Sequence, residues 1–178
     1  DKHGVRTLKL QGGQGWETDA RMLAEVRAAV GNTIELIVDA NSSYAREEAL
    51  EYVRTLAHAG VTVAEDPCPL APDAGYSALQ RDCGLPILVD LSCASADDAR
   101  LYAGRGARAL AAKPARIGFS EARAIENVAA GGHARLAVRS VVHICGVVKT
   151  GRTSTPPVLA QGARAAHSSA VSRSATSI

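Results

Sequence analysis

The sequence predicts an α/β fold of parallel strands, in which a partial TIM-type (β/α) barrel with an irregular C-terminal tail is favoured. Short runs of apolar, β-prone residues alternate with segments of helical periodicity over the first 130 residues. Each run ends in a polar residue, and these residues recur at a near-constant spacing. Past residue 130 the alternation fails and the composition changes, which predicts the tail.

The first unit begins with an alternating strand over residues 5–10, followed by the glycine-rich turn 12–15. A helix follows, with Thr18 as its expected N-cap and Asp19 in its first turn. Its apolar residues recur with a period of 3.6. Gly31 is expected to end this helix, because glycine readily adopts the left-handed conformation found at helix C-termini.

The following four units repeat this plan. Gly60 ends the second helix, and Pro67 prevents the third strand from continuing. The fourth helix opens with Ser95 and Asp98, which resemble a capping box with aspartate in place of glutamate. The expected strands are 35–39, 61–65, 86–90 and 109–113. The expected helices are 49–57, about 76–82, a helix from 95 onward, and about 120–130.

The polar strand ends are evenly spaced. Asp39 and Glu65 are 26 residues apart, Glu65 and Asp90 are 25 apart, and Asp90 and Lys113 are 23 apart. Units of this period imply parallel strands with right-handed crossovers. An open doubly wound sheet and a closed barrel both fit, and both place ligands at the C-terminal ends of the strands. Carboxylates on adjacent strands that converge on one point favour the barrel.

Three of these strand-end residues are carboxylates: Asp39, Glu65 and Asp90. Close together without a counter-ion, they would repel one another. A hard divalent cation removes this conflict, and ligation by carboxylate oxygens alone suits Mg²⁺ or Mn²⁺ rather than zinc. The spacing therefore predicts one metal ion at this end of the strands, the alternative being three ordinary polar strand ends.

The charge distribution divides the chain at residue 130. Residues 1–130 hold 14 Lys and Arg and all 18 Asp and Glu, whereas residues 131–178 hold 6 Lys and Arg and no acid. We predict that 1–130 is a partial barrel carrying the ligands, and that 131–178 is a basic Ser/Ala/Arg-rich tail, disordered or from a shifted reading frame. A strand within 136–148 remains compatible with its apolar residues. The scattered bases predict no nucleic-acid partner.

Composition bears on several other classes of protein. No stretch of about 18 or more apolar residues occurs, so we expect no membrane-spanning helix and no membrane partner. Residues 1–4 do not resemble a signal peptide, and the absence of an initiator Met indicates a chain that begins within a domain. The cysteines form no C-x-x-C pair and are typical of small buried thiols in a reducing cytoplasm. They are Cys68, Cys83, Cys93 and Cys145.

The strand ends belong to short motifs that together resemble the mandelate racemase/muconate lactonizing family of the enolase superfamily. They occur in order, and at the spacing of that family, within residues 4–130. No single motif is specific, but five in register are. The motifs are Leu8-Lys9-Leu10-Gln11, Val38-Asp39-Ala40-Asn41, Glu65-Asp66-Pro67, Val89-Asp90-Leu91, and Ala112-Lys113-Pro114 followed by Ile117-Gly118.

The resemblance implies an enzyme that removes the α-proton of a small carboxylate substrate, as an isomerase, cycloisomerase or dehydratase. Asp39, Glu65 and Asp90 would bind Mg²⁺ or Mn²⁺, which stabilises the enediolate formed by proton removal. Lys113 would be the base, since a lysine beside a divalent cation gives up its proton more readily. Lys9 would offer positive charge to the substrate. Full-length relatives are expected to be cytoplasmic homo-oligomers.

Two residues depart from the pattern of that family. The first strand usually carries Lys-x-Lys, and Gln11 replaces the second lysine with an amide that accepts no proton at neutral pH. Leu91 replaces an acidic residue that usually follows the third ligand, which removes a carboxylate from the surroundings of the metal. A one-base elimination is therefore favoured over a two-base racemization. The alternative is a truncated, inactive remnant of such an enzyme.

Other readings of the same segments remain. The turn Gly12-Gly13-Gln14-Gly15 lies between a strand and a helix, where phosphates bind, but it fits neither G-x-G-x-x-G nor the P-loop pattern. A remnant with open sheet edges would associate with other chains through them. His143 falls in the tail and is disfavoured as the catalytic base.

Overall fold

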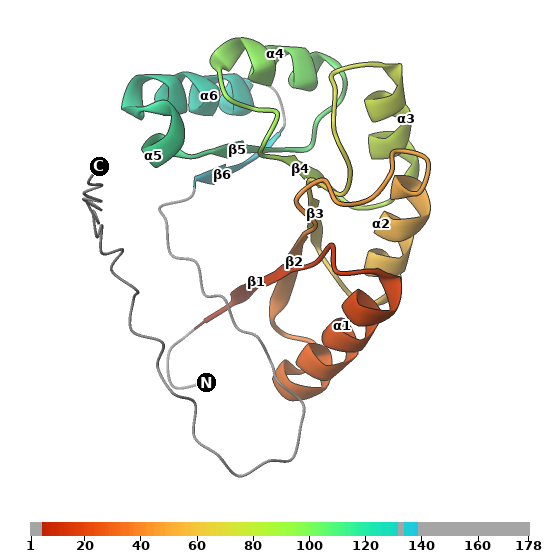
Figure 1. The fold of residues 1–178 in the computed structure, drawn as a ribbon. Coiled ribbons are helices and arrows are strands. Elements are labelled where there is room, and N and C mark those ends of the chain that lie inside the picture. Colours follow the sequence, from red (N-terminus) through yellow and green to blue (C-terminus); the bar gives the residue numbers. More distant parts are fainter. Residues whose placement is uncertain (1–4, 132–133, 139–178) are drawn as a thin grey trace, which may run out of the picture. The chain divides into compact units, whose positions relative to one another are not determined.

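The structure is a computed structural model of the 178-residue chain, and it describes residues 5–131 and 134–138, the last four as backbone only. Strands and helices alternate along this part of the chain (Figure 1). The strands are β1 (Thr7–Gln11), β2 (Glu35–Asp39), β3 (Val63–Glu65), β4 (Ile87–Val89), β5 (Ala109–Ala112) and β6 (Arg135–Val138). The helices are α1 (Trp16–Val30), α2 (Ala49–His58), α3 (Ala74–Asp82), α4 (Ala96–Gly104), α5 (Pro114–Ile117) and α6 (Phe119–Gly131).

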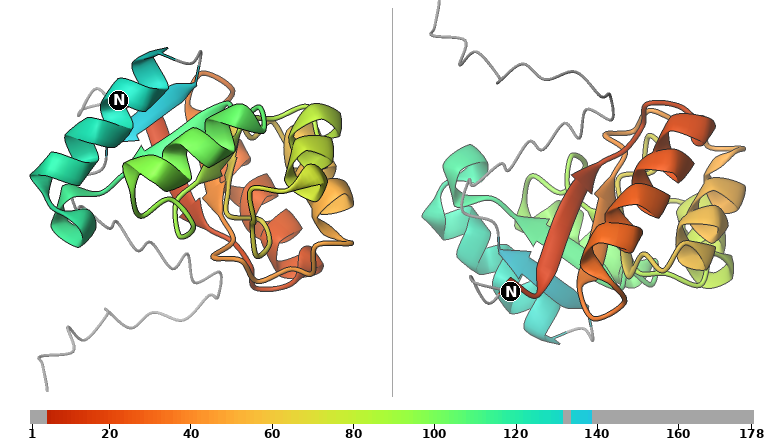
Figure 2. Two further views of the ribbon diagram at one scale, coloured as in Figure 1. Left: turned by 90° about the horizontal axis from the view of Figure 1, so that it is seen from above. Right: turned by 90° about the horizontal axis from the view of Figure 1, so that it is seen from below.

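The strands form one parallel sheet in the order β1-β2-β3-β4-β5-β6. Crossovers between parallel strands are right-handed as a rule, and because the order never reverses, such crossovers carry every helix to the same face of the sheet. Figures 1 and 2 show the helices along the outside of the curved sheet. An open doubly wound sheet would carry helices on both faces. The sequential order therefore confirms the predicted partial TIM-type barrel.

Apolar side chains pack on both faces of the sheet. A large cluster fills the space between the strands and the helices, and a small one lies among the side chains of the opposite, inner face. The large cluster includes Leu23, Leu36, Val38, Leu56, Ile87, Val89, Leu110 and Ile125. The small cluster consists of Leu88, Ala109 and Ala111, with Val63 packed against it. Because strand side chains alternate between faces, the strand-end residues Asp39, Glu65 and Asp90 belong to the inner face.

The predicted elements are confirmed, with differences at their ends. Helix α1 begins at Trp16 after Gly15, so the prediction that Thr18 is the N-cap was wrong. Ser95 does cap α4, and its hydroxyl accepts a hydrogen bond from the Asp98 amide at 3.1 Å. Past residue 113 the chain forms the short helix α5 before α6.

Most of the predicted tail lies outside the described residues, and so do Cys145 and His143. The part that is described includes β6, which pairs with β5. Cys68, Cys83 and Cys93 are free and buried, and burial raises the pKa of the Cys68 and Cys93 thiols to about 11. In the described part of the chain, no helix is long and apolar enough to cross a membrane.

Candidate metal and proton-transfer site

The parallel register brings the predicted site residues to one edge of the sheet. Gln11 pairs with Asp39 in the β1–β2 ladder, and Asp39 pairs with Glu65 in the β2–β3 ladder. Asp90 directly follows β4, and Lys113 directly follows β5. Residues far apart in the sequence thus come to the C-terminal ends of adjacent strands, with Gln11, Asp39 and Glu65 in register and Asp90 two residues beyond Leu88, the partner of Glu65.

The first part of the site is a buried pair of carboxylates bridged by a lysine. Glu65 is fully buried and Asp39 is 5% exposed. Lys9 extends its ammonium group between them, with Nζ 2.5 Å from Asp39 Oδ2 and 2.8 Å from Glu65 Oε1. Buried carboxylates require a counter-charge. Lys9 supplies it here from the middle of β1, two residues before the strand ends.

The second part is Asp90, which lies between two cations. Lys113 Nζ forms an ion pair with its Oδ2, and Arg116 Nη1 lies 3.1 Å from its Oδ1. Arg116 also donates hydrogen bonds to the carbonyl oxygens of Asp90, at 2.8 Å, and Cys93, at 3.1 Å. Burial acts to raise the pKa of Asp90, but the hydrogen bond and charge of Lys113 and the charge of Arg116 outweigh it and lower this pKa. Asp90 is therefore held as a carboxylate.

The donor chemistry of this edge fits a hard divalent cation. Its acidic side chains offer only oxygen atoms, which Mg²⁺ and Mn²⁺ prefer. Across residues 5–131 and 134–138, however, no group of three or more His, Cys, Asp or Glu side chains is arranged to hold a metal ion. In the structure, oxygens of all three carboxylates are instead paired with lysine ammonium groups, those of Asp39 and Glu65 with Lys9 and that of Asp90 with Lys113.

Comparison with known proteins identifies the family of this chain. The family model described as enolase C-terminal domain-like matches residues 1–155. The chain belongs to this family. This membership confirms the resemblance to the mandelate racemase and muconate lactonizing branch that the strand-end motifs indicated.

Individual relatives agree with the membership. The chain is 32% identical over 98 residues to a hydrophobic dipeptide epimerase from Enterococcus faecalis. The aligned segment covers 55% of this chain and 28% of that protein. It superposes on muconate cycloisomerase from Pseudomonas fluorescens with a TM-score of 0.66 at 26% identity, covering 74% of this chain and 37% of that one. A racemase from Streptomyces coelicolor A3(2) with bound magnesium gives 0.70 at 22% identity, covering 79% and 40%. The chain thus spans less than half the length of these relatives.

Gln11 and Leu91, the two residues that depart from the usual motifs of the enolase C-terminal domain-like family, both lie at the C-terminal ends of the strands. Gln11 lies at the end of β1, and its side-chain amide donates a 2.8 Å hydrogen bond to the Asp39 carbonyl oxygen. Leu91 is 51% exposed and follows Asp90 at the same edge. Gln11 therefore holds the backbone of a candidate ligand, a role that its position in the motif did not reveal.

The glycine-rich loop after β1 is shaped by close packing. A Cβ on Gly12 would lie 2.7 Å from Val38 Cγ1, and one on Gly13 would lie 2.6 Å from the Ala40 carbonyl oxygen. Gly13 also has a φ of +78°, which favours glycine. The amides of Gly13 and Gln14 donate to the Asp19 carboxylate at 2.8 and 3.2 Å. Because these amides are used within the chain, the loop does not offer them to a phosphate.

Asp19 is a buried residue that the sequence placed only in a first helical turn. Besides the two loop amides, its Oδ2 accepts hydrogen bonds from the Tyr44 hydroxyl at 2.7 Å and the Tyr52 hydroxyl at 2.8 Å. Burial and the hydrogen bond to Asp19 raise the pKa of Tyr44 to about 12, and the same causes raise that of Tyr52. Asp19 thereby joins the loop after β1 to the segment between β2 and α2 and to α2 itself.

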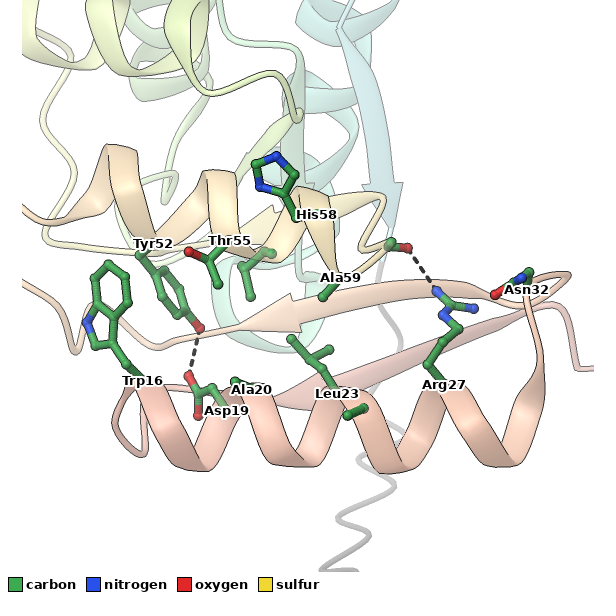
Figure 3. Close-up of a pocket in the computed structure, with 13 residues that line it drawn as sticks. Trp16, Asp19, Ala20, Leu23, Arg27, Asn32, Tyr52, Thr55, His58 and Ala59 are labelled. Atoms are coloured by element: carbon green, nitrogen blue, oxygen red, sulfur yellow. Dashed lines mark hydrogen bonds between the residues drawn. The ribbon is translucent and has the colours of Figure 1, made fainter.

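A pocket of about 540 Å³ lies beside this cluster, between α1 and α2 (Figure 3). Its lining includes Trp16, Asp19 and Leu23 from α1 and Tyr52 and Thr55 from α2. None of the strand-end carboxylates or lysines lines it. The pocket is on the helical side of the sheet, whereas the candidate site is on the inner face, so the two are separate features.

Proposed function

We propose that this chain carries the metal-binding and proton-transfer residues of a mandelate racemase/muconate lactonizing-type enzyme, which removes the α-proton of a small carboxylate substrate. The observation that carries this proposal is that Asp39, Glu65 and Asp90 stand at the C-terminal ends of three consecutive strands, with Asp39 and Glu65 in register and Asp90 two residues beyond Leu88, the partner of Glu65. Family membership supports the reaction class. Because the chain spans only part of its relatives, the activity of the whole protein is also part of the proposal.

The carboxylates of Asp39, Glu65 and Asp90 would hold Mg²⁺ or Mn²⁺ through oxygen alone. When bound, the cation supplies positive charge that stabilises the oxyanion developing on the substrate. The burial of all three residues supports this role, because a water-poor site strengthens that electrostatic effect. Lys9, released from Asp39 and Glu65, would be free to pair with the substrate carboxylate.

Lys113 is the proposed base. It follows β5, is 22% exposed in its side chain, and points to Asp90, so its amine lies at the mouth of the site. To accept a proton, the amine must first be neutral, and loss of its ion pair with Asp90, whose carboxylate would turn to a bound cation, would favour that state. The α-proton would then pass from the substrate carbon to Nζ, and the electron pair left behind would move into the substrate carboxylate.

The chemistry at the opposite side of the site supports a one-base reaction. Inverting a stereocentre requires proton removal on one face and delivery on the other, hence a second proton carrier. Gln11 lies at the end of β1, with three strands between it and β5, and its amide is not such a carrier. Cycloisomerisation, dehydration or another isomerisation that inverts no stereocentre is therefore proposed ahead of the epimerisation named for its dipeptide-epimerase relative.

Deuterium exchange tests this function. The 178-residue chain is incubated with Mg²⁺ in deuterium oxide with a panel of dipeptides and sugar acids, and loss of the α-proton signal is followed by NMR. We expect exchange on at least one class, reduced about 100-fold or more in Lys113→Ala. Arg123→Ala, which removes an exposed cation of α6, serves as control. Unchanged exchange in Lys113→Ala would show that another group is the base.

A second candidate is an inactive remnant of such an enzyme. Two observations favour it: Lys9 bridges Asp39 and Glu65, and Gln11 replaces a potential base. In that case the ion pairs are purely structural. The remnant predicts no exchange on any carboxylate, and a fold whose stability does not respond to Mg²⁺.

A further inference from the structure

Asp66 is a buried carboxylate, 1% exposed, to which the proposed function assigns no part. It directly follows Glu65, and its two carboxylate oxygens accept hydrogen bonds from consecutive backbone amides of another strand end. The Asp90 amide lies 3.2 Å from Oδ1 and the Leu91 amide lies 2.8 Å from Oδ2. The carboxylate thus holds the backbone at the point where Asp90 leaves β4.

The backbone of Asp66 makes two further connections. Its carbonyl oxygen accepts a 2.7 Å hydrogen bond from the Ser42 amide, in the loop after Asp39. Its own amide donates to the Leu88 carbonyl oxygen of β4 at 3.1 Å. One residue therefore links the loops that follow Asp39, Glu65 and Asp90.

The backbone conformation at these positions is a second, independent observation. In the described part of the chain, the non-glycine residues with positive φ are Asn41 (47°), Ser42 (59°) and Asp66 (39°). Each follows Asp39 or Glu65 by no more than three residues. Such conformations cost free energy and persist where surrounding contacts impose them, commonly at functional sites. Here the imposing contacts include the hydrogen bonds of Asp66.

We infer that Asp66 is a positioning residue, which orients Asp90 and the loop after β2 so that the strand-end carboxylates face one point. That the orientation serves metal binding rests on the proposed function. The orientation itself rests only on the hydrogen bonds. An asparagine would not replace Asp66, because its amide nitrogen would face one of the two N–H donors instead of accepting from it.

The test compares Asp66→Asn and Asp66→Ala with Gln80→Ala in the 178-residue chain. Gln80 is a matched control, since it is 3% exposed and also binds the backbone of β4. Its side-chain oxygen accepts a 3.0 Å hydrogen bond from the Ile87 amide. It acts at the start of β4, whereas Asp66 acts at its end. The readouts are backbone amide hydrogen exchange, followed by NMR, and Mn²⁺ affinity, measured by calorimetry.

In Asp66→Asn we expect the amide of Asp90 or Leu91 to exchange at least about 10-fold faster than in the wild type, and Mn²⁺ affinity to fall about 10-fold or more. Gln80→Ala should affect the Ile87 amide while leaving Mn²⁺ affinity unchanged. Unchanged exchange at Asp90 and Leu91 in folded Asp66→Asn, or equal loss of affinity in Gln80→Ala, would overturn the inference. If the wild type binds no Mn²⁺, the proposed function fails, and the exchange rates alone decide whether Asp66 positions Asp90.

Discussion

At the scale of single residues, Asp19 shows what local sequence does not reveal. Its position in the first turn of α1 predicts a favourable interaction with the helix N-terminus. In the structure it turns back to the loop before the helix and accepts hydrogen bonds from the amides of Gly13 and Gln14 and the hydroxyls of Tyr44 and Tyr52. Two of these donors lie 25 and 33 residues away, a distance over which sequence periodicity carries no information.

Replacing Asp19 tests whether this cluster stabilises the fold. In Asp19→Ala, four donors lose a shared acceptor in a buried place, so the free energy of unfolding should fall by roughly 2–4 kcal/mol. Urea denaturation measures the change. Asp19→Asn keeps one acceptor oxygen and should lose less. A value for Asp19→Ala within about 0.5 kcal/mol of the wild type would contradict the cluster's structural role.

Gln11 makes a stereochemical prediction possible. If Lys113 is the sole base, the wild type should exchange the α-proton of an active substrate without inverting the stereocentre. Gln11→Lys restores a proton carrier at the end of β1 and should add inversion, detectable by chiral chromatography. Wild-type inversion as fast as exchange would show that a second proton carrier already acts in the site.

At the scale of elements, strand positions were predicted more closely than helix starts. Strands β2 to β5 are largely apolar and mostly buried between two layers, so composition alone marks them. The start of α1 instead depends on how the preceding loop folds. Gly15 adopts a φ of 101°, and the helix begins immediately after it. The side-chain oxygen of Thr18 was expected to cap this helix, but Thr18 lies within its first turn.

Helix α3 offers a pH-dependent test of a cap. The Asp73 carboxylate accepts a 2.9 Å hydrogen bond from the Tyr76 amide. It also accepts hydrogen bonds from Nη2 and Nη1 of Arg46, at 2.7 and 2.9 Å. The hydrogen bond to Arg46, and then that from Tyr76, lower the pKa of Asp73 from 3.8 to about 2. Since the folded state lowers this pKa, the associated stability is present above pH 3.8 and is lost as pH falls toward 2.

We therefore expect Asp73→Asn, which retains a capping side chain, to have a lower thermal midpoint than the wild type at neutral pH. The difference should shrink as pH falls from about 4 to about 2. Asp97→Asn removes an exposed carboxylate of α4 paired with Arg100 and should change the midpoint little at any pH. A difference for Asp73→Asn that stays constant across this range would contradict the assigned ion pair.

At the scale of the whole molecule, the sequence located the candidate ligands but not their counter-charges. Equal spacing of strand ends predicts that Asp39, Glu65 and Asp90 lie at the same end of the sheet, because parallel units of similar length place their C-terminal ends together. That Lys9 reaches both Asp39 and Glu65, or that Arg116 in α5 supports Asp90, depends on side chains that reach from one element to another. Linear spacing does not encode such contacts, and Arg116 was missed for this reason.

The central claim, that three strand-end carboxylates form one divalent-metal site, is tested most directly by calorimetric titration of Mg²⁺ into the 178-residue chain. We predict one binding site per chain in the wild type, lost in Asp39→Ala and in Glu65→Ala, and retained in Asp97→Ala, which removes an exposed carboxylate. An absence of binding at millimolar Mg²⁺, or wild-type affinity in Asp39→Ala, would contradict the claim and favour the inactive remnant.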